Sequence, residues 1–194
     1  MRNLLGRRFA IDTNIVGNRT PAVSSLWRYH DTGWIQLVKT DTLDTELAGT
    51  SDPAKRDRLL REVAPLVEQL GPLVLDHSRL NFSVTGSDAD QASLNEVIQV
   101  LYGEDDPRRP GAARSRQRIR DAMHVNTAKR YGLDGLVTLD KKDLLDREPA
   151  IREAFGGGFQ IYDPERALAF VERLRARYEV RQAGYVRSKR AADD

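Results

Sequence analysis

The amino-acid sequence predicts an α/β protein, a three-layer α/β/α sandwich in which helices cover both faces of a five-stranded parallel sheet. Short apolar runs alternate along the chain with segments of helical periodicity, which is the order expected when helical crossovers join parallel strands. The apolar runs are continuous, as is typical of strands buried on both faces. The length of 194 residues suits one domain with its own core.

Five apolar runs are expected to form the strands. They span residues 8–11, 35–38, 73–75, 136–139 and 159–162. The first run leads directly into Asp12 and the fourth into Asp140. In an open parallel sheet ligands bind outside the carboxyl ends of the strands, so both aspartates are predicted to lie at one rim.

Capping residues and helical spacing predict the helices between the strands. Pro21 opens one helix, and several caps between Thr40 and Thr45 precede a short helix that contains Glu46. Further helices are expected over residues 52–70 with a kink at Pro65, 88–102, 115–130 and 163–174. Residues 1–184 are predicted to form a single domain, and the basic tail 185–194 is expected to be disordered.

Composition narrows the class of protein. Hydrophobic residues make up 40% and charged residues 31% of the chain, which is typical of a soluble globular protein. Without cysteine the chain offers neither a disulfide framework nor a thiolate metal site, and this fits the reducing cytoplasm. Asp12 interrupts the first apolar run and no later stretch is long enough to span a bilayer, so we expect a cytoplasmic protein without a membrane partner.

A cluster of arginines precedes and enters the predicted helix over 115–130. The formal net charge of +2 is weak evidence for a nucleic-acid partner, so the distribution of charge carries more weight. We expect the cluster to neutralise phosphates and to guide RNA into an acidic cleft, with contacts from Arg108, Arg109, Arg114 and Arg116. The alternative is a solvated loop whose charge is offset by Asp105 and Asp106.

Two further acids are candidates for the same rim. Asp121 lies on the apolar side of its predicted helix with Val125 and Ala128, where an uncompensated carboxylate is costly. Glu46 lies in the short helix after the second strand. Carboxylates gathered without matching cations favour a divalent ion, and oxygen ligands favour Mg²⁺ or Mn²⁺. Taken singly, each strand-ending aspartate also fits a helix cap or a turn.

Four segments resemble the PIN-domain family in the order of its usual motifs. They are Phe9-Ala10-Ile11-Asp12-Thr13-Asn14, Glu46-Leu47, Asp121-Ala122-Met123-His124 and residues 137–145, which read Val-Thr-Leu-Asp-Lys-Lys-Asp-Leu-Leu. The similarity extends from about Phe9 to Val171. It implies a five-stranded parallel sheet, an acidic metal site and endonuclease activity on RNA, often in the toxins of toxin–antitoxin pairs.

The resemblance also implies roles for particular residues. The positions that match the family's acidic ligands are Asp12, Asp121 and Asp140, with Glu46 as its helix-two acid and Asn14 and Thr138 as polar residues beside the site. Asp41 and Asp44 lie close to Glu46 and are alternatives for the helix-two acid. The implied reaction is hydrolysis of RNA by a metal-activated water, in which Glu46 is a ligand or the general base. An antitoxin protein and a second copy of the chain are the further partners considered.

Two other functions fit part of the pattern. A haloacid-dehalogenase-like phosphatase also starts from an aspartate after its first strand, but it needs a second aspartate where this chain has Asn14. A catalytically inactive PIN-like module that only binds RNA has no need of all four acids. His124 stands three residues after Asp121 and is within reach of the site, although a lone histidine on a packed helix is more often structural.

Overall fold

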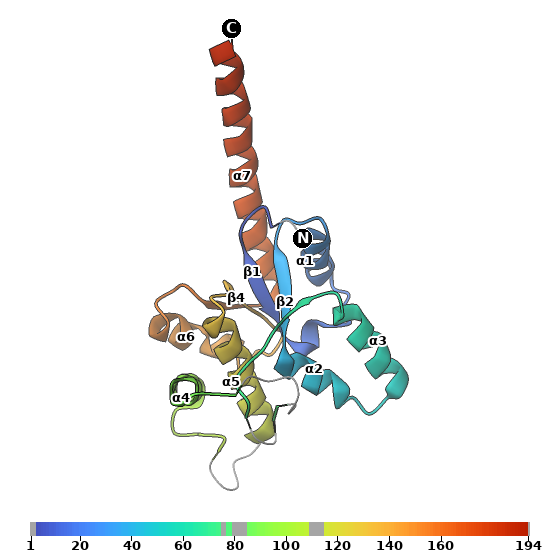
Figure 1. The fold of residues 1–194 in the computed structure, drawn as a ribbon, viewed down its shortest axis with the longest axis vertical. Coiled ribbons are helices and arrows are strands. Elements are labelled where there is room, and N and C mark those ends of the chain that lie inside the picture. Colours follow the sequence, from blue (N-terminus) through green and yellow to red (C-terminus); the bar gives the residue numbers. More distant parts are fainter. Residues whose placement is uncertain (1–2, 75–76, 79–84, 109–114, 194) are drawn as a thin grey trace.

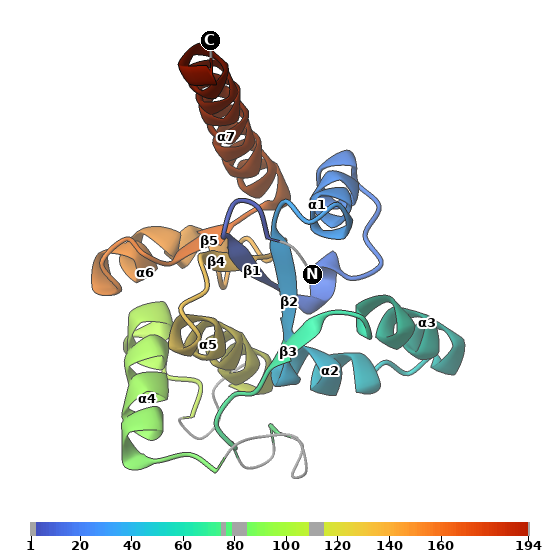
Figure 2. The same cartoon turned by 45° about the horizontal axis from the view of Figure 1, so that its top comes forward.

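The structure is a computed structural model that describes residues 3–74, 77–78, 85–108 and 115–193. These residues form an α/β/α sandwich around a five-stranded sheet in which each pairing is parallel (Figures 1 and 2). The strand order is β3–β2–β1–β4–β5, with β1 at the centre. The predicted fold class is therefore confirmed. The strands are β1 (Arg8–Ile11), β2 (Gln36–Thr40), β3 (Val67–Gln69), β4 (Gly135–Val137) and β5 (Gln160–Tyr162).

Helices cover both faces of the sheet and enclose two cores. Phe9 and Ile11 of β1 belong to the core that α1, α2, α3 and α7 cover, whereas Ala10 belongs to the core beneath α4, α5 and α6. Successive residues of a strand face opposite sides of the sheet, so the continuous apolar run of β1 serves both cores. The helices are α1 (Pro21–Asp31), α2 (Asp41–Ala48), α3 (Pro53–Val63), α4 (Asp88–Tyr102), α5 (Ser115–Arg130), α6 (Glu148–Ala154) and α7 (Pro164–Asp193).

The third strand lies earlier in the chain than the sequence predicted. We expected a helix over 52–70 with a kink at Pro65 and a strand over 73–75, but α3 ends at Val63 and β3 covers Val67–Gln69. Pro65 has no N–H to continue the helix and its ring would collide with the carbonyl four residues back, so the helix ends instead of bending. Val67 then pairs with Val38 of β2. Residues 73 and 74 lie in no strand, and residue 75 lies outside the described residues.

Helical structure is more extensive than expected after β4. Helix α6, which has proline in its first turn, and the short 3-10 helix Leu145–Arg147 before it were not predicted. Helix α7 continues to Asp193, so the tail that we expected to be disordered is helical, and Figure 1 shows it projecting from the body of the domain. The structure describes the segment over residues 103–113, which lies between α4 and α5 in the chain, only as far as Arg108. None of the described helices is long and apolar enough to cross a membrane.

A glycine is required where β4 meets β5. A side chain at Gly135 would place its Cβ 2.3 Å from the carbonyl oxygen of Gln160 and 2.8 Å from the ring of Tyr162. Both distances are well below van der Waals contact, and the first involves backbone that cannot turn aside. The close approach of β5 to β4, and with it the start of α7 two residues later, therefore depends on the missing side chain.

We expect Gly135→Ala to lower the free energy of unfolding by about 2 kcal/mol or more, because backbone and ring atoms must move away from the new methyl group. Urea denaturation measures the change. Gly158→Ala is the matched control, since a Cβ at Gly158 meets nothing within 4 Å. Equal stability of the two variants would contradict the close packing of β4 against β5.

Candidate metal centre

Four elements converge at the carboxyl ends of the central strands. Asp12 directly follows β1, and the chain beyond β4 leads through Thr138 to Asp140. Strands β1 and β4 pair side by side, so the two aspartates enter the same rim of the sheet. Helix α2 follows β2 and carries Glu46, whereas Asp121 comes from α5, which packs against α2. The parallel topology thus gathers acids that are far apart in the sequence.

The four predicted acids fall into two groups of potential ligands. Each group also contains one residue that the sequence had not selected as a ligand. The first group is Asp12, Glu46 and His124, and the second is Asp121, Asp140 and Asp143. Within each group the ligand atoms lie within 4.8 Å of one another. The charges of Asp12 and Glu46 both act on Asp121, so the two groups adjoin. We call these six residues the acidic centre.

Asp12 is held by hydrogen bonds to both of its oxygens. The backbone N–H of Thr13 donates to Oδ1 at 2.6 Å, and the Asn14 amide and the Thr138 hydroxyl donate to Oδ2, each at 2.6 Å. Thr138 Oγ1 also accepts from the backbone N–H of Asp140 at 2.9 Å. The two polar residues selected from the sequence therefore contact Asp12 directly, and Thr138 links it to the turn that carries Asp140.

Asp140 has a structural role as well. Its Oδ1 accepts from the backbone N–H of Asp143 at 2.9 Å, which closes the turn after β4. The turn brings the Asp143 carboxylate into the second group of ligands, a position that the sequence motif contained but did not single out. Asp140 therefore caps a turn, which was one of the two roles that its sequence position allowed. It also belongs to the acidic centre.

His124 belongs to the acidic centre, although its sequence position favoured a purely structural role. Its side chain is fully buried, with Nε2 3.3 Å from Glu46 Oε2 and Nδ1 2.7 Å from Thr40 Oγ1. The Thr13 hydroxyl donates to the same Glu46 oxygen. The only sequence signal for this contact was the spacing of three residues from Asp121, which places both side chains on one side of α5.

Protons offset part of the repulsion among the buried acids. Burial raises the pKa of Asp12, and burial together with the charge of Asp12 raises the pKa of Asp121 to about 8. Burial alone acts to lower the pKa of His124, but its hydrogen bond to Glu46 and the charge of Glu46 raise it to about 9. Burial opposes ionisation of Glu46 too, yet the contact with His124 holds its pKa below the usual value. At neutral pH the metal-free centre thus holds a protonated Asp121 and an imidazolium.

Two carboxylate oxygens of the centre have no hydrogen-bond partner among the described residues. They are Asp121 Oδ2 and Glu46 Oε1, and both atoms are buried. A buried polar atom without a partner costs about 1–3 kcal/mol, and more when it is charged. Each group of potential ligands contains one of these two oxygens, so a cation bound in each group would satisfy both oxygens. The donor set, carboxylates with one imidazole, fits Mn²⁺ or Mg²⁺ better than a metal that requires thiolates.

Two arginines on α5 stand beside the acids. Arg118 Nε lies 3.4 Å from Asp143 Oδ1, and its guanidinium lies 5.1 Å from the centre of the Tyr102 ring. The positive charge of Arg120 acts on Glu46. Arg120 Nε is buried and has no hydrogen-bond partner among the described residues. These side chains offer donors for an anion at the acidic centre.

The arginines that the sequence selected for RNA contacts are placed differently. Arg108 is tied to Asp106, with Nε 2.9 Å from Oδ1, and it also hydrogen-bonds Asn95 of α4. Arg116 is exposed in the first turn of α5. Arg109 and Arg114 lie outside the described residues. The charge of Arg108 is therefore offset by a neighbouring acid, Asp106, as the alternative interpretation of the sequence expected.

The alternatives to Glu46 are engaged elsewhere. Asp44 Oδ2 lies 2.6 Å from Lys39 Nζ in a buried ion pair. Asp41 Oδ1 accepts from the backbone N–H of Thr42 at 2.9 Å at the start of α2. Neither belongs to the two groups of potential ligands, whereas Glu46 does.

Comparison of the chain with protein-family models, with curated proteins and with solved structures finds no match in any of the three. The interpretation of the acidic centre therefore rests on the chemistry and geometry of its own residues.

In the metal-free protein the contribution of Asp121 to stability should be lost as pH rises from about 4 to about 8, because the pKa of Asp121 is about 8 when folded and near 4 when unfolded. Between these values the folded state keeps a proton that the unfolded state has lost. Asp121→Asn retains the uncharged form, so it should melt at a higher temperature than the wild type at pH 8 in EDTA and at a similar temperature at about pH 4.

Thermal unfolding across this pH range measures the effect. Asp57→Asn removes the same charge from an exposed position on α3 and serves as the control. If Asp121→Asn and Asp57→Asn follow the same pH dependence, burial of a protonated Asp121 is contradicted.

Proposed function

We propose that the protein is a metal-dependent endoribonuclease that hydrolyses phosphodiester bonds of RNA with Mg²⁺ or Mn²⁺. The observation that carries the proposal is the meeting of acids from four separate elements in two adjoining groups, each with a buried oxygen that lacks a partner. Such a centre is costly for the fold, and a pair of adjacent divalent ions is a common device for phosphodiester chemistry. The resemblance to the PIN-domain family adds RNA as the substrate.

The residues of the chain have distinct tasks in this mechanism. Asp12, Asp121, Asp140 and Asp143 would hold the ions, and the hydrogen bonds from Asn14 and Thr138 fix the orientation of Asp12. Mg²⁺ or Mn²⁺ bound there would supply a water of lowered pKa and neutralise charge on the phosphate oxygens. His124 orients Glu46, which serves as a ligand or accepts the proton of the attacking water. Arg120, whose charge acts on Glu46, would donate to a phosphate oxygen.

The expected products are internal RNA fragments with a 5′-phosphate and a 3′-hydroxyl, because a water attacks the phosphorus and the 3′ oxygen leaves. A role as the toxin of a toxin–antitoxin pair, with an antitoxin protein as partner, is part of the proposal through the family resemblance. The structure also bears on the phosphatase alternative. Asn14 donates to Asp12 and accepts from the backbone N–H of Leu139 at 2.8 Å, so this position orients a carboxylate and cannot act as a second acid.

Asp12→Asn should reduce RNA cleavage by about two orders of magnitude or more while the protein stays folded, because the change removes a ligand charge but keeps the size of the side chain. Cleavage of a mixed RNA pool is followed with Mn²⁺, with Mg²⁺ and in EDTA, where we expect no activity. A small phosphate monoester is tested in parallel.

Undiminished cleavage by folded Asp12→Asn would overturn the site. Turnover of the monoester without cleavage of RNA would point to a phosphatase. If the wild type cleaves neither substrate with any metal, the protein is a binding module.

The acid on α2 can be tested separately. Glu46→Gln should lower cleavage strongly, because it removes the negative charge that faces His124, whereas Asp44→Asn should leave the turnover of folded protein near that of the wild type. Asp44→Asn is expected to lower stability by about 3 kcal/mol, since it leaves Lys39 buried and unpaired. A reversed pattern of activity would assign the α2 acid to Asp44.

A further inference from the structure

The described side chains that anchor helix α7 to the domain lie in its first half. Phe170 packs against Phe9 and Tyr162. The rings of Tyr178 and Trp34 are perpendicular to each other, with their centres 5.7 Å apart. Beyond this contact the described side chains, from Glu179 to Tyr185, are exposed, and Val180 keeps 73% of its surface accessible. Figures 1 and 2 show this half of the helix extending from the sandwich at the end of β1 opposite to α2 and α5.

Four exposed arginines follow one side of α7. They are Arg166, Arg173, Arg177 and Arg181, and their spacing of seven, four and four residues places them on one face of a helix. This arginine face extends over about 22 Å. Arg166 Nη2 lies 4.0 Å from Glu148 Oε2, whereas the other three make no hydrogen bond or ion pair with any described residue. The face therefore has three positive charges available for a partner.

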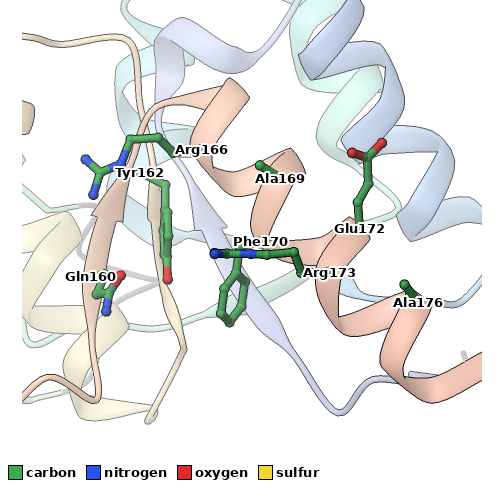
Figure 3. Close-up of a pocket in the computed structure, with 8 residues that line it drawn as sticks. All are labelled: Gln160, Tyr162, Arg166, Ala169, Phe170, Glu172, Arg173 and Ala176. Carbon is green, nitrogen blue, oxygen red and sulfur yellow. The ribbon is translucent and has the colours of Figure 1, made fainter. Parts of the chain in front are cut away.

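A cavity of about 570 Å³ lies where the arginine face begins, between α7 and the edge strand β5 (Figure 3). Arg166 and Arg173 line it together with the rings of Tyr162 and Phe170 and the amide of Gln160. Glu172 is the one acid among its lining residues. A second cavity of about 410 Å³ borders the face farther along, at Arg177 and Arg181. Guanidinium groups beside aromatic rings and an amide can bind phosphates and an unpaired base.

We propose that the arginine face of α7 binds the phosphate backbone of single-stranded RNA and that the cavity beside β5 accepts one of its bases. The inference rests on the proposed function, because it assigns a second contact surface to the same substrate. The acidic centre repels the RNA backbone, so part of the affinity must come from positive charge elsewhere. Arg108 is engaged by Asp106, whereas three arginines of the face, Arg173, Arg177 and Arg181, have no such partner among the described residues.

The arginine face also lies on a path from the acidic centre. Helix α7 starts after β5, and β5 is the neighbour of β4, which leads to Asp140. The end of β5 is joined to the turn after β4 by a hydrogen bond from the N–H of Thr138 to the carbonyl of Tyr162, 2.9 Å long. A strand of RNA bound along α7 would thus reach the rim of the sheet on the side of Asp140, and α7 would set how far from the bound end the RNA is cut.

Binding is measured by fluorescence anisotropy with a labelled single-stranded RNA of about 20 nucleotides, in EDTA so that no cleavage occurs. The test variant carries Arg173→Gln, Arg177→Gln and Arg181→Gln. We expect its Kd to rise at least about tenfold at low salt, and the slope of log Kd against log salt to fall by about two, as three lost phosphate contacts on a single strand imply. Replacement of the same three arginines by lysine should restore most of the salt slope.

The matched control removes the same charge from scattered exposed positions on α1, α3 and α6, through Arg28→Gln, Arg58→Gln and Arg152→Gln. Equal weakening of RNA binding in both triple variants, or no weakening in the α7 variant, overturns the proposal. Stronger competition by poly-glutamate than by unlabelled RNA would overturn it in favour of an acidic protein partner. A wild-type dimer that dissociates in the α7 variant would overturn it in favour of self-association.

Cleavage assays separate this inference from the proposed function. If the wild type cuts no RNA but binds it through the arginine face, the nuclease proposal fails and the binding surface stands. If the wild type cuts RNA and the α7 variant binds it as tightly as the wild type does, only the arginine face fails. If the inference is right, the α7 variant should also lose the preferred distance between the bound end and the cut.

Discussion

Repulsion among buried carboxylates at the rim of the sheet is the constraint around which the acidic centre is organised. Three donors converge on Asp12, the raised pKa of Asp121 favours its protonated form at neutral pH in the metal-free centre, and His124 faces Glu46. Each device reduces the cost of bringing negative charge out of water. Two buried oxygens are still without a partner among the described residues, so the compensation within the chain is incomplete. The divalent cation that we propose would supply the missing compensation without removing the negative charge that binds it.

The parallel sheet supplies the geometry that makes this concentration of charge feasible. Strands β1 and β4 lie side by side at its centre, so the residues that follow them share hydrogen bonds, as Thr138 does with Asp12 and Asp140. Both strands are buried and apolar, which makes the rim a boundary between a low-dielectric core and solvent. Charges at such a boundary interact more strongly than on an open surface. The same packing that stabilises the fold therefore strengthens the field at the acidic centre.

Negative and positive charge are separated along the molecule. The acidic centre lies at the carboxyl ends of the strands, whereas the arginine face follows α7. Figure 1 shows this helix running out of the sandwich. Gly135 affects the position of the arginine face, because it allows β5 to approach β4 closely and α7 begins just after β5. In the proposed nuclease the first region performs the chemistry and the second supplies affinity. A weak net charge of +2 conceals this separation.

Local order along the chain determined the fold class and placed Asp12 and Asp140 after apolar runs, because both depend on short-range periodicity and on the rule that parallel strands end at one rim. The neighbours Asn14 and Thr138 were indicated only by the family resemblance. Local order misplaced β3, since an apolar helical pattern across Pro65 outweighed the short run at Val67–Gln69. Only the tertiary structure decided that His124 meets Glu46, 78 positions away, that Asp121 joins Asp140 and Asp143, and that β5 and α7 line a cavity. Such contacts depend on how α2, α5 and α7 pack across the sheet, and no periodicity in the sequence encodes the distance between side chains on separate elements.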